Sequence, residues 1–319
     1  MSVVEAAANQ IPRIASTHVL RDTDLTPDEL RALMRLATDV KAAPRDYSRA
    51  LAGRYGSLLF EKPSLRTRVT FELAMKQLGG DAVYQDHRGD RIGEREPARD
   101  MARNLDRWFD VVIARTYSQE TLDDLARWSS IPVVNALSGV YHPCQAMADL
   151  LTVNERFGGL EGLKIAYVGD GNNVAHSLML TAVSLGVAMA FAGPEGYGPE
   201  AEVIEAAQNR ARETGAELIL TNDVDVAVRA AAAIYTDVWT SMGWEEETQE
   251  RRIAFREFQV DGEMMAKARP DAIFMHCLPA LRGEEVTDAV IESEQSVVFD
   301  QAENRLHAQK ALLLMLLSK

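Results

Sequence analysis

The stretch that decides the fold runs Phe60-Glu61-Lys62-Pro63-Ser64-Leu65-Arg66-Thr67-Arg68. The apolar run before it, from Tyr55, predicts a buried strand. After it, apolar residues recur at helical spacing as far as Leu78 and stop at Gly79-Gly80, which predicts a helix ended by a glycine C-cap. Ser64 is therefore expected at the start of a helix that directly follows a strand.

The start of this helix carries the groups of an anion-binding site. Free backbone N–H groups and the positive end of the helix dipole favour an anion there. Ser64 and Thr67 add hydroxyl donors, and Arg66 and Arg68 add guanidinium groups suited to phosphate or carboxylate. The alternative is a capped surface helix with ordinary arginines, and this stretch alone does not decide between the two.

Length and composition limit the class of protein. A chain of 319 residues is long for a single core and favours two domains. Its net charge of −14 argues against nucleic acid and anionic membranes as partners. No apolar run reaches transmembrane length, and the N-terminus lacks a signal-peptide core. Two cysteines, Cys144 and Cys277, cannot build a disulfide framework or a four-cysteine zinc site. We expect a soluble, cytoplasmic protein.

Short apolar runs alternate with helical patterns along the chain. Strands are expected near 55–60, 82–85, 111–114, 133–136, 164–168, 188–192, 217–220, 232–236, 272–277 and 296–300. The alternation predicts an α/β protein with two similar-sized domains, each a mostly parallel sheet flanked by helices and joined by long interdomain helices. We place the first domain at 1–143, with a C-terminal helix of about 302–319 packing back onto it, and the second at 144–301.

Polar residues follow several of these strands. Arg115 ends the strand at 111–114, and His142-Pro143-Cys144-Gln145 follows the strand at 133–136. Ligands of parallel sheets bind beyond the carboxyl ends of the strands, so these groups could converge with Ser64 to Arg68. For Arg115 alone, a surface salt bridge is the simpler interpretation.

A glycine-rich loop, Gly169-Asp170-Gly171-Asn172-Asn173-Val174, also joins a strand to a helix. It is placed as a dinucleotide-binding loop would be, but Val174 occupies the position of the third glycine, which argues against NAD(P). Asn172 and Asn173 could instead hydrogen-bond a polar small molecule, or they could simply form a turn.

Two segments that follow later strands have side chains capable of chemistry. Asp237, in Asp237-Val238-Trp239-Thr240-Ser241-Met242-Gly243, could hold a ligand ammonium group, although a strand-to-loop turn explains the segment equally well. In His276-Cys277-Leu278-Pro279, Cys277 could be a nucleophile, but a buried apolar cysteine is the usual outcome. The spacing does not establish a base that would activate Cys277.

Taken together and in order, these segments resemble the aspartate/ornithine carbamoyltransferase family from about residue 18 to the C-terminus. Each segment is weak evidence by itself, whereas the ordered set is specific. The segments that carry the resemblance are Ser64 to Arg68, Arg115-Thr116-Tyr117, His142 to Gln145, Gly169 to Asn173, Asp237 to Gly243, His276 to Pro279 and Glu303-Asn304-Arg305. The family implies a homotrimer with active sites shared between neighbours, and no cofactor or metal.

The resemblance implies two sets of binding residues. Carbamoyl phosphate would be held by Ser64, the Leu65 backbone, Arg66, Thr67, Arg115, His142, Gln145, the carbonyls of Cys277 and Leu278, and Arg305. Ornithine would be held by Asn173, Asp237, Ser241 and Met242. The catalytic groups would be Arg66, Arg115, His142, Asp237 and Cys277. The first domain would then bind carbamoyl phosphate and the second ornithine.

The implied activity transfers the carbamoyl group of carbamoyl phosphate to the δ-amine of L-ornithine, a step of arginine biosynthesis that gives L-citrulline and phosphate. The Ser-Met-Gly segment resembles the ornithine-specific members. Within the family, the alternative substrate is putrescine or an N-acylated ornithine. Outside it, the alternatives are a nicotinamide-dependent oxidoreductase and a catalytically silent binding module.

The chain departs from the family pattern at three positions. Leu65 stands where many relatives have threonine, a mild change if the backbone makes the contact. Leu281 replaces a common histidine, and Arg91 replaces a glutamine that in relatives reaches a neighbouring subunit's phosphate. Arg91 and the nearby Arg95 are left outside the predicted site, although either could serve the site of a neighbouring subunit.

Overall fold

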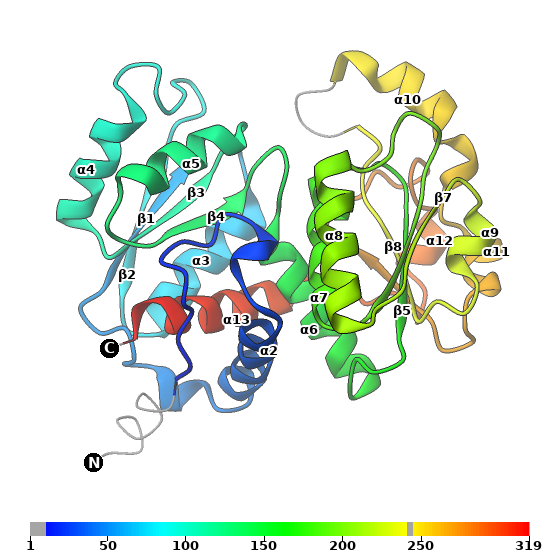
Figure 1. Cartoon of the computed structure of the whole chain (residues 1–319), viewed down its shortest axis with the longest axis horizontal. Helices are drawn as coiled ribbons and strands as arrows, with labels where there is room; N and C mark the ends of the chain where they lie inside the picture. Colours follow the sequence, from blue (N-terminus) through cyan, green and yellow to red (C-terminus); the bar gives the residue numbers. More distant parts are fainter. Residues whose placement is uncertain (1–10, 241–244, 319) are drawn as a thin grey trace. The chain divides into compact units, whose positions relative to one another are not determined.

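The computed structural model describes residues 11–240 and 245–318. The chain divides into two compact units, the first formed by Met1–Leu151 with Glu303–Lys319 and the second by Thr152–Ala302 (Figure 1). Helices α6 (Pro143–Phe157) and α13 (Val298–Leu317) each run from one unit into the other. The prediction of two α/β domains joined by long helices is confirmed. None of the helices in the described ranges is long and apolar enough to cross a membrane.

The sheet of the first unit has four parallel strands in the order β2-β1-β3-β4. These strands are β1 (Tyr55–Phe60), β2 (Asp81–Asp86), β3 (Val111–Arg115) and β4 (Val133–Leu137). β3 and β4 are buried along their whole length, as expected where helices cover both faces of a parallel sheet. β2 lies at one edge and is partly exposed.

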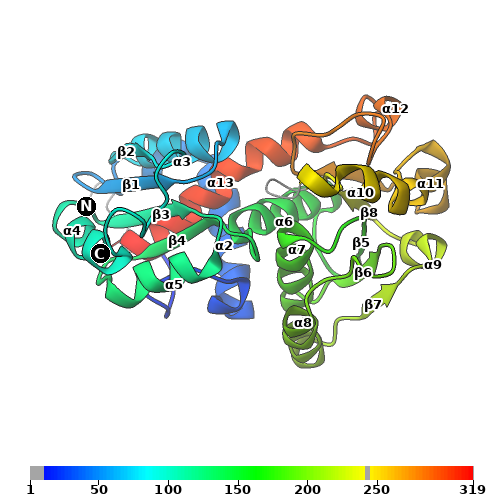
Figure 2. The same cartoon turned by 90° about the horizontal axis from the view of Figure 1, so that it is seen from above.

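Helices cover both faces of this sheet. Alternate side chains of β1 and β3, Leu59 and Val112 among them, pack in one cluster with α4 (Ala98–Trp108) and α5 (Gln119–Trp128). Figure 2 shows α3 (Leu65–Gln77) on the opposite side of the strands from α5. Thr26 and Glu29 form a capping box that begins α2 (Pro27–Ala42).

The sheet of the second unit has five parallel strands in the order β7-β6-β5-β8-β9. They are β5 (Lys164–Val168), β6 (Ala188–Ala192), β7 (Leu218–Thr221), β8 (Ala233–Thr236) and β9 (Ile273–His276). Helices α7 (Asn173–Ser184), α8 (Ala201–Thr214), α9 (Val224–Val228) and α11 (Gly262–Lys267) lie where the pattern predicts helices. Two short helices, α10 (Thr248–Ala254) and α12 (Asp288–Ile291), were not predicted.

The predicted strand at 296–300 is wrong. Ser296 makes only an isolated bridge with Phe274, and α13 begins at Val298. Val298 is buried in the apolar cluster of the second unit, so this short apolar run marks a buried helix start. Short apolar runs do not distinguish a buried strand from a buried helix by periodicity alone.

Because all strands within each sheet are parallel, their carboxyl ends lie at one edge. In the first unit this edge carries the start of α3, Arg115 and the segment leading to His142. In the second unit it carries the Gly169 loop, Asp237 and Cys277. Each unit thus carries several of its predicted binding residues at one edge of its own sheet.

Candidate active site

The helix start predicted at Ser64 is present at α3. Ser64 is its N-cap, and the Ser64 hydroxyl accepts a hydrogen bond from the Thr67 backbone N–H at 3.2 Å. The Arg68 guanidinium lies 3.8 Å from the centroid of the Tyr84 ring, a cation–π contact. This contact holds the Arg68 side chain against strand β2. Arg66 is therefore the better candidate to bind an anion at the helix terminus.

A buried arginine joins three distant segments of the first unit. Arg305, only 2% exposed, donates from Nη2 to the Thr67 hydroxyl at 3.0 Å and from Nη1 to the Gln145 side-chain oxygen. Gln145 in turn donates to Asp149 at 2.7 Å. A buried guanidinium must have polar partners, because desolvating a charge costs several kcal/mol, on the order of a whole domain's net stability. Thr67, Gln145 and Arg305 thus form one network.

His142 lies near two of the arginines. Burial, assisted by the charges of Arg305 and Arg115, lowers the pKa of His142 well below its ordinary value. Its imidazole is therefore neutral at physiological pH. A neutral imidazole still has one N–H donor, so His142 can hydrogen-bond a carbonyl oxygen. Arg115, which is also buried, ends β3 and places a positive charge near His142.

One buried carboxylate, Glu61, hydrogen-bonds two loops at the carboxyl ends of the strands of the first unit. Glu61 accepts hydrogen bonds from the backbone N–H groups of Ile92 and Tyr117, each at 2.8 Å. The Lys62 ammonium and the Arg91 guanidinium each lie 4.5 Å from the centroid of the Tyr117 ring. Glu61 therefore holds the loop that carries Arg91 beside the segment that carries Arg115.

In the second unit, three loops converge on Asp237. Asn172 donates from its side-chain nitrogen to Asp237 Oδ2 at 2.9 Å, and Cys277 donates from Sγ to Asp237 Oδ1 at 3.0 Å. These residues follow β5, β8 and β9, so the order of the strands brings them together. Asn172 also caps α7 through its side-chain oxygen, which fixes the orientation of its amide.

His276 is buried, and hydrogen bonds occupy both of its ring nitrogens. Nδ1 accepts from the Leu278 backbone N–H at 2.8 Å, so Nε2 carries the hydrogen and donates it to Glu285 at 3.1 Å. His276 therefore cannot serve as the base for the adjacent Cys277 thiol in this arrangement. The ligand atoms of Asp237, His276 and Cys277 lie within 4.8 Å of one another, but a metal ion would have to displace one of these hydrogen bonds.

The glycines of the 169–173 loop have a local structural role. Gly169 has a φ of +142°, in the region that favours glycine. A Cβ atom on Gly171 would lie 2.2 Å from the Gly198 carbonyl carbon. Close packing thus explains this glycine spacing without a bound dinucleotide.

Comparison with known families matches a different domain model to each of the two units. Residues 17–155 match the family model described as the carbamoyl-P binding domain of aspartate/ornithine carbamoyltransferase, and residues 161–316 match its Asp/Orn binding domain. The chain belongs to the aspartate/ornithine carbamoyltransferase family. The resemblance inferred from the ordered motifs is therefore confirmed.

Individual carbamoyltransferases are similar to the chain over nearly its whole length. An ornithine carbamoyltransferase of Rhodococcus opacus is 50% identical over 304 residues, which cover 95% of this chain and 96% of that protein. One from Pyrococcus abyssi is 49% identical and covers 92% of this chain and 93% of its own. The solved ornithine carbamoyltransferase of Pyrococcus furiosus superimposes with a TM-score of 0.91 at 47% identity, covering 95% and 97% of the two chains.

The residues predicted from the family resemblance are distributed over the two units. The first unit carries Ser64, Leu65, Arg66, Thr67, Arg115, His142, Gln145 and Arg305, and the second carries Asn173, Asp237, Cys277 and Leu278. Ser241 and Met242, predicted to contact ornithine, lie outside the described residues. Sequence reasoning missed Glu61, although an acidic residue that ends a buried apolar run and directly precedes the anion-binding motif was a usable signal.

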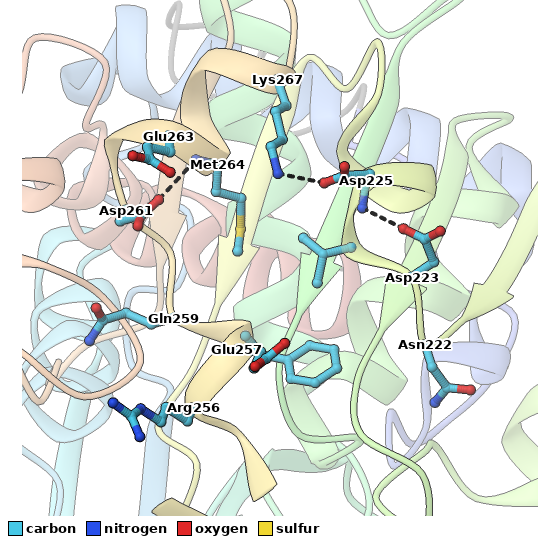
Figure 3. Close-up of a pocket in the computed structure, with 12 residues that line it drawn as sticks. Asn222, Asp223, Asp225, Arg256, Glu257, Gln259, Asp261, Glu263, Met264 and Lys267 are labelled. Carbon is cyan, nitrogen blue, oxygen red and sulfur yellow. Dashed lines mark hydrogen bonds and ion pairs between the residues drawn. The ribbon is translucent and has the colours of Figure 1, made fainter. Parts of the chain in front are cut away.

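Two features have no role in the predicted carbamoyltransferase chemistry. Burial raises the pKa of the Cys144 thiol to about 12, so Cys144 is not a reactive thiolate at neutral pH. A pocket of about 470 Å³ opens beyond the end of β7 (Figure 3) and is lined by Asn222 to Asp225, Arg256 to Gln259, Asp261, Glu263, Met264 and Lys267. None of the predicted site residues within the described ranges lines it. Lys267 is paired with Asp225 there, and Asp261 caps α11.

Proposed function

We propose that the chain transfers the carbamoyl group of carbamoyl phosphate to the δ-amine of L-ornithine and releases L-citrulline and phosphate. The observation that carries this proposal is the Thr67–Arg305–Gln145 network close to the neutral His142. Thr67, His142 and Gln145 lie in the part of the chain that matches the carbamoyl-P binding domain model. The similar proteins named ornithine carbamoyltransferase support ornithine as the acceptor. The relative from Pyrococcus furiosus that is named anabolic favours the synthetic direction, and hence arginine biosynthesis.

In the proposed reaction, the first unit binds the phosphate and polarises the carbonyl group. Ser64, Thr67, Arg66 and the Leu65 backbone hold the phosphate at the start of α3, with Arg305 behind Thr67. Arg115 and His142 donate to the carbonyl oxygen. Negative charge grows on this oxygen as the amine attacks, and fixed donors stabilise that charge more than they stabilise the ground state.

The second unit must deliver an uncharged amine. A lysine-like amine has a pKa of ~10.4, so only about one part in 2,500 is neutral at pH 7. The Asp237–Cys277 pair is suited to holding the δ-amine while its proton is lost, and the Cys277 and Leu278 carbonyls are proposed acceptors for the carbamoyl NH₂. The amine nitrogen then bonds to the carbonyl carbon, the bond from that carbon to the phosphate oxygen breaks, and one amine proton leaves with the released phosphate. No enzyme nucleophile is required, so Cys277 is proposed to orient the amine.

An amine panel tests the proposed substrate. At fixed carbamoyl phosphate, we expect colorimetric ureido-product formation with L-ornithine to exceed that with putrescine or Nα-acetylornithine by about 100-fold or more in kcat/KM, because a site that pairs polar substrate groups strongly rejects analogues that leave them unpaired. Faster turnover of either alternative amine would reassign the acceptor. Absence of any ureido product would contradict the carbamoyltransferase proposal itself.

We also propose a homotrimer with active sites shared between neighbours, as the family resemblance implies. An exposed apolar stripe on α3 supports it: Leu65, Val69 and Leu73 recur at helical spacing and are 75%, 41% and 39% exposed. Val83, on the edge strand β2, adds a further exposed apolar side chain. The stripe begins one residue after Ser64, so assembly on it would also enclose the start of α3.

The Val69→Glu variant tests this surface. We expect wild type to have about three times the 35.3 kDa chain mass by light scattering, and Val69→Glu to dissociate, because burying an unpaired carboxylate costs several kcal/mol. Val226→Glu, at a similarly exposed valine of α9, is the matched control and should leave the mass unchanged. A trimer in the Val69→Glu variant would exclude this stripe from the interface.

A further inference from the structure

Arg251 of α10 is a buried arginine in the second unit that the proposed chemistry does not use. It is 7% exposed, and its Nη1 lies 3.0 Å from the Trp239 carbonyl oxygen and 3.0 Å from Asp170 Oδ1. Its Nε donates to Glu247 at 2.9 Å. The guanidinium also lies 5.0 Å from the centroid of the Tyr197 ring. One side chain therefore contacts four separate positions in the chain.

Two of these contacts are close in the chain to Asp237, which is proposed to hold ornithine. Asp170 lies two residues before Asn172, the donor to Asp237, and Trp239 lies two residues after Asp237. The Arg251 guanidinium thus ties the loop after β5 to the loop after β8. The position of Asp237 relative to Asn172 depends on these two loops keeping their separation.

Aromatic side chains support the same arginine. Trp239 stacks on Phe255 with a centroid distance of 5.9 Å, and Tyr197 meets Phe255 edge-on at 4.9 Å. Phe255 directly follows α10, so the helix that carries Arg251 is itself packed against the residue whose carbonyl Arg251 binds. The Tyr197 ring beside the guanidinium and the packing of Phe255 against Trp239 limit the movement of Arg251 relative to its partners.

Charge explains why an arginine is needed here. Burial raises the pKa of Asp170 to about 6, while Arg251 opposes the rise and Asp237 and Glu247 add to it. Without the guanidinium, the Asp170 carboxylate would lose its counter-charge while the negative charges of Asp237 and Glu247 still act on it. Like charges in a partly buried region repel strongly, so the loops would move apart or take up a proton.

From these contacts we infer that Arg251 is a positioning residue for the amino-acid substrate, holding the 169–173 loop and the 237–240 segment in the arrangement that presents Asp237. The inference rests on the proposed function, because it assigns Asp237 to ornithine. A residue with this role acts mainly on ornithine binding and changes carbamoyl phosphate binding little, since Ser64, Arg66 and Thr67, which are proposed to hold the phosphate group, belong to the other unit.

The test compares Arg251→Ala and Arg251→Lys with Arg252→Ala. Arg252 is the matched control, because it is the next residue of the same helix and its ion pair, with Glu284, lies at a more exposed position. For Arg251→Ala we expect the KM for ornithine to rise about 10-fold or more while the calorimetric Kd for carbamoyl phosphate changes less than about twofold. Lysine restores the charge without the planar fork, so Arg251→Lys should recover only part of this loss. Arg252→Ala should behave as wild type.

Equal loss of both substrates, or an unchanged KM for ornithine in Arg251→Ala, would overturn the inference. If Arg251→Ala does not fold, Asp170→Asn removes the same ion pair while keeping the side-chain shape, and the KM for ornithine should again rise selectively; an unchanged KM there would overturn the inference as well. Turnover of the amine panel by the wild type distinguishes failure of this inference from failure of the proposed function. If wild type prefers another amine, the choice of ornithine fails, and the Arg251 comparison is made with that amine.

Discussion

The Arg66→Ala variant is expected to retain at most about 1% of wild-type kcat/KM for carbamoyl phosphate. Arg66 lies in the first turn of α3, where the N-terminal N–H groups and the Ser64 cap already favour an anion. Its guanidinium would add a charge-assisted contact to a phosphate that gains charge as it leaves. Losing a contact that strengthens in the transition state lowers kcat as well as affinity.

Steady-state kinetics with carbamoyl phosphate varied at saturating ornithine measure this effect. Lys76→Ala is the control, because Lys76 is a cation of the same helix that pairs with Glu72 in the last turn, away from the phosphate end. We expect Lys76→Ala to remain within about twofold of wild type, as is usual for exposed helix ion pairs. Near-normal citrulline synthesis by Arg66→Ala would remove Arg66 from the mechanism.

The second large effect is expected for Asp237→Asn, with a loss of about 10- to 100-fold in kcat/KM for ornithine, roughly the worth of one hydrogen bond to a charged group. Asparagine keeps the shape of the side chain but removes the charge that would hold an ammonium group. It also disturbs the local network, because the Asn172 amide is fixed by its cap on α7 and presents its nitrogen to position 237. In the variant, a single amide oxygen cannot accept from both Asn172 and Cys277 as the two carboxylate oxygens of Asp237 do.

Calorimetry with each substrate tests this assignment directly. Binding of carbamoyl phosphate should stay close to wild type in Asp237→Asn, whereas ornithine binding measured in the presence of saturating phosphate should weaken. Asp225→Asn provides the control, since Asp225 is a carboxylate of the same unit that pairs with Lys267 at the surface. Equal weakening of both substrates would contradict a specific role of Asp237 in ornithine binding.

Most strands and helices of this chain are predictable from local patterns. Both sheets consist of apolar runs bounded by polar or glycine-rich turns, and α2 and α3 have caps that are visible in the sequence. The run at 296–300 was misassigned because its apolar residues belong to the buried start of a helix. Helix α10 lacks an apolar stripe, and the sequence therefore had no signal for the helix that carries Arg251.

By itself, the sequence determined the fold class, the capped start of α3 and, through ordered motifs, the family. These properties depend on residues close together in the chain or on motif order, so they do not require distances across the fold. Only the tertiary structure decided that Arg305 reaches Thr67 and Gln145, that Glu61 clamps two loops, that both nitrogens of His276 are engaged and that Arg251 joins the loops around Asp237. Such partnerships depend on strand order and on which polar groups are buried together, and a buried charge selects its partner by proximity in space, whatever the separation along the chain.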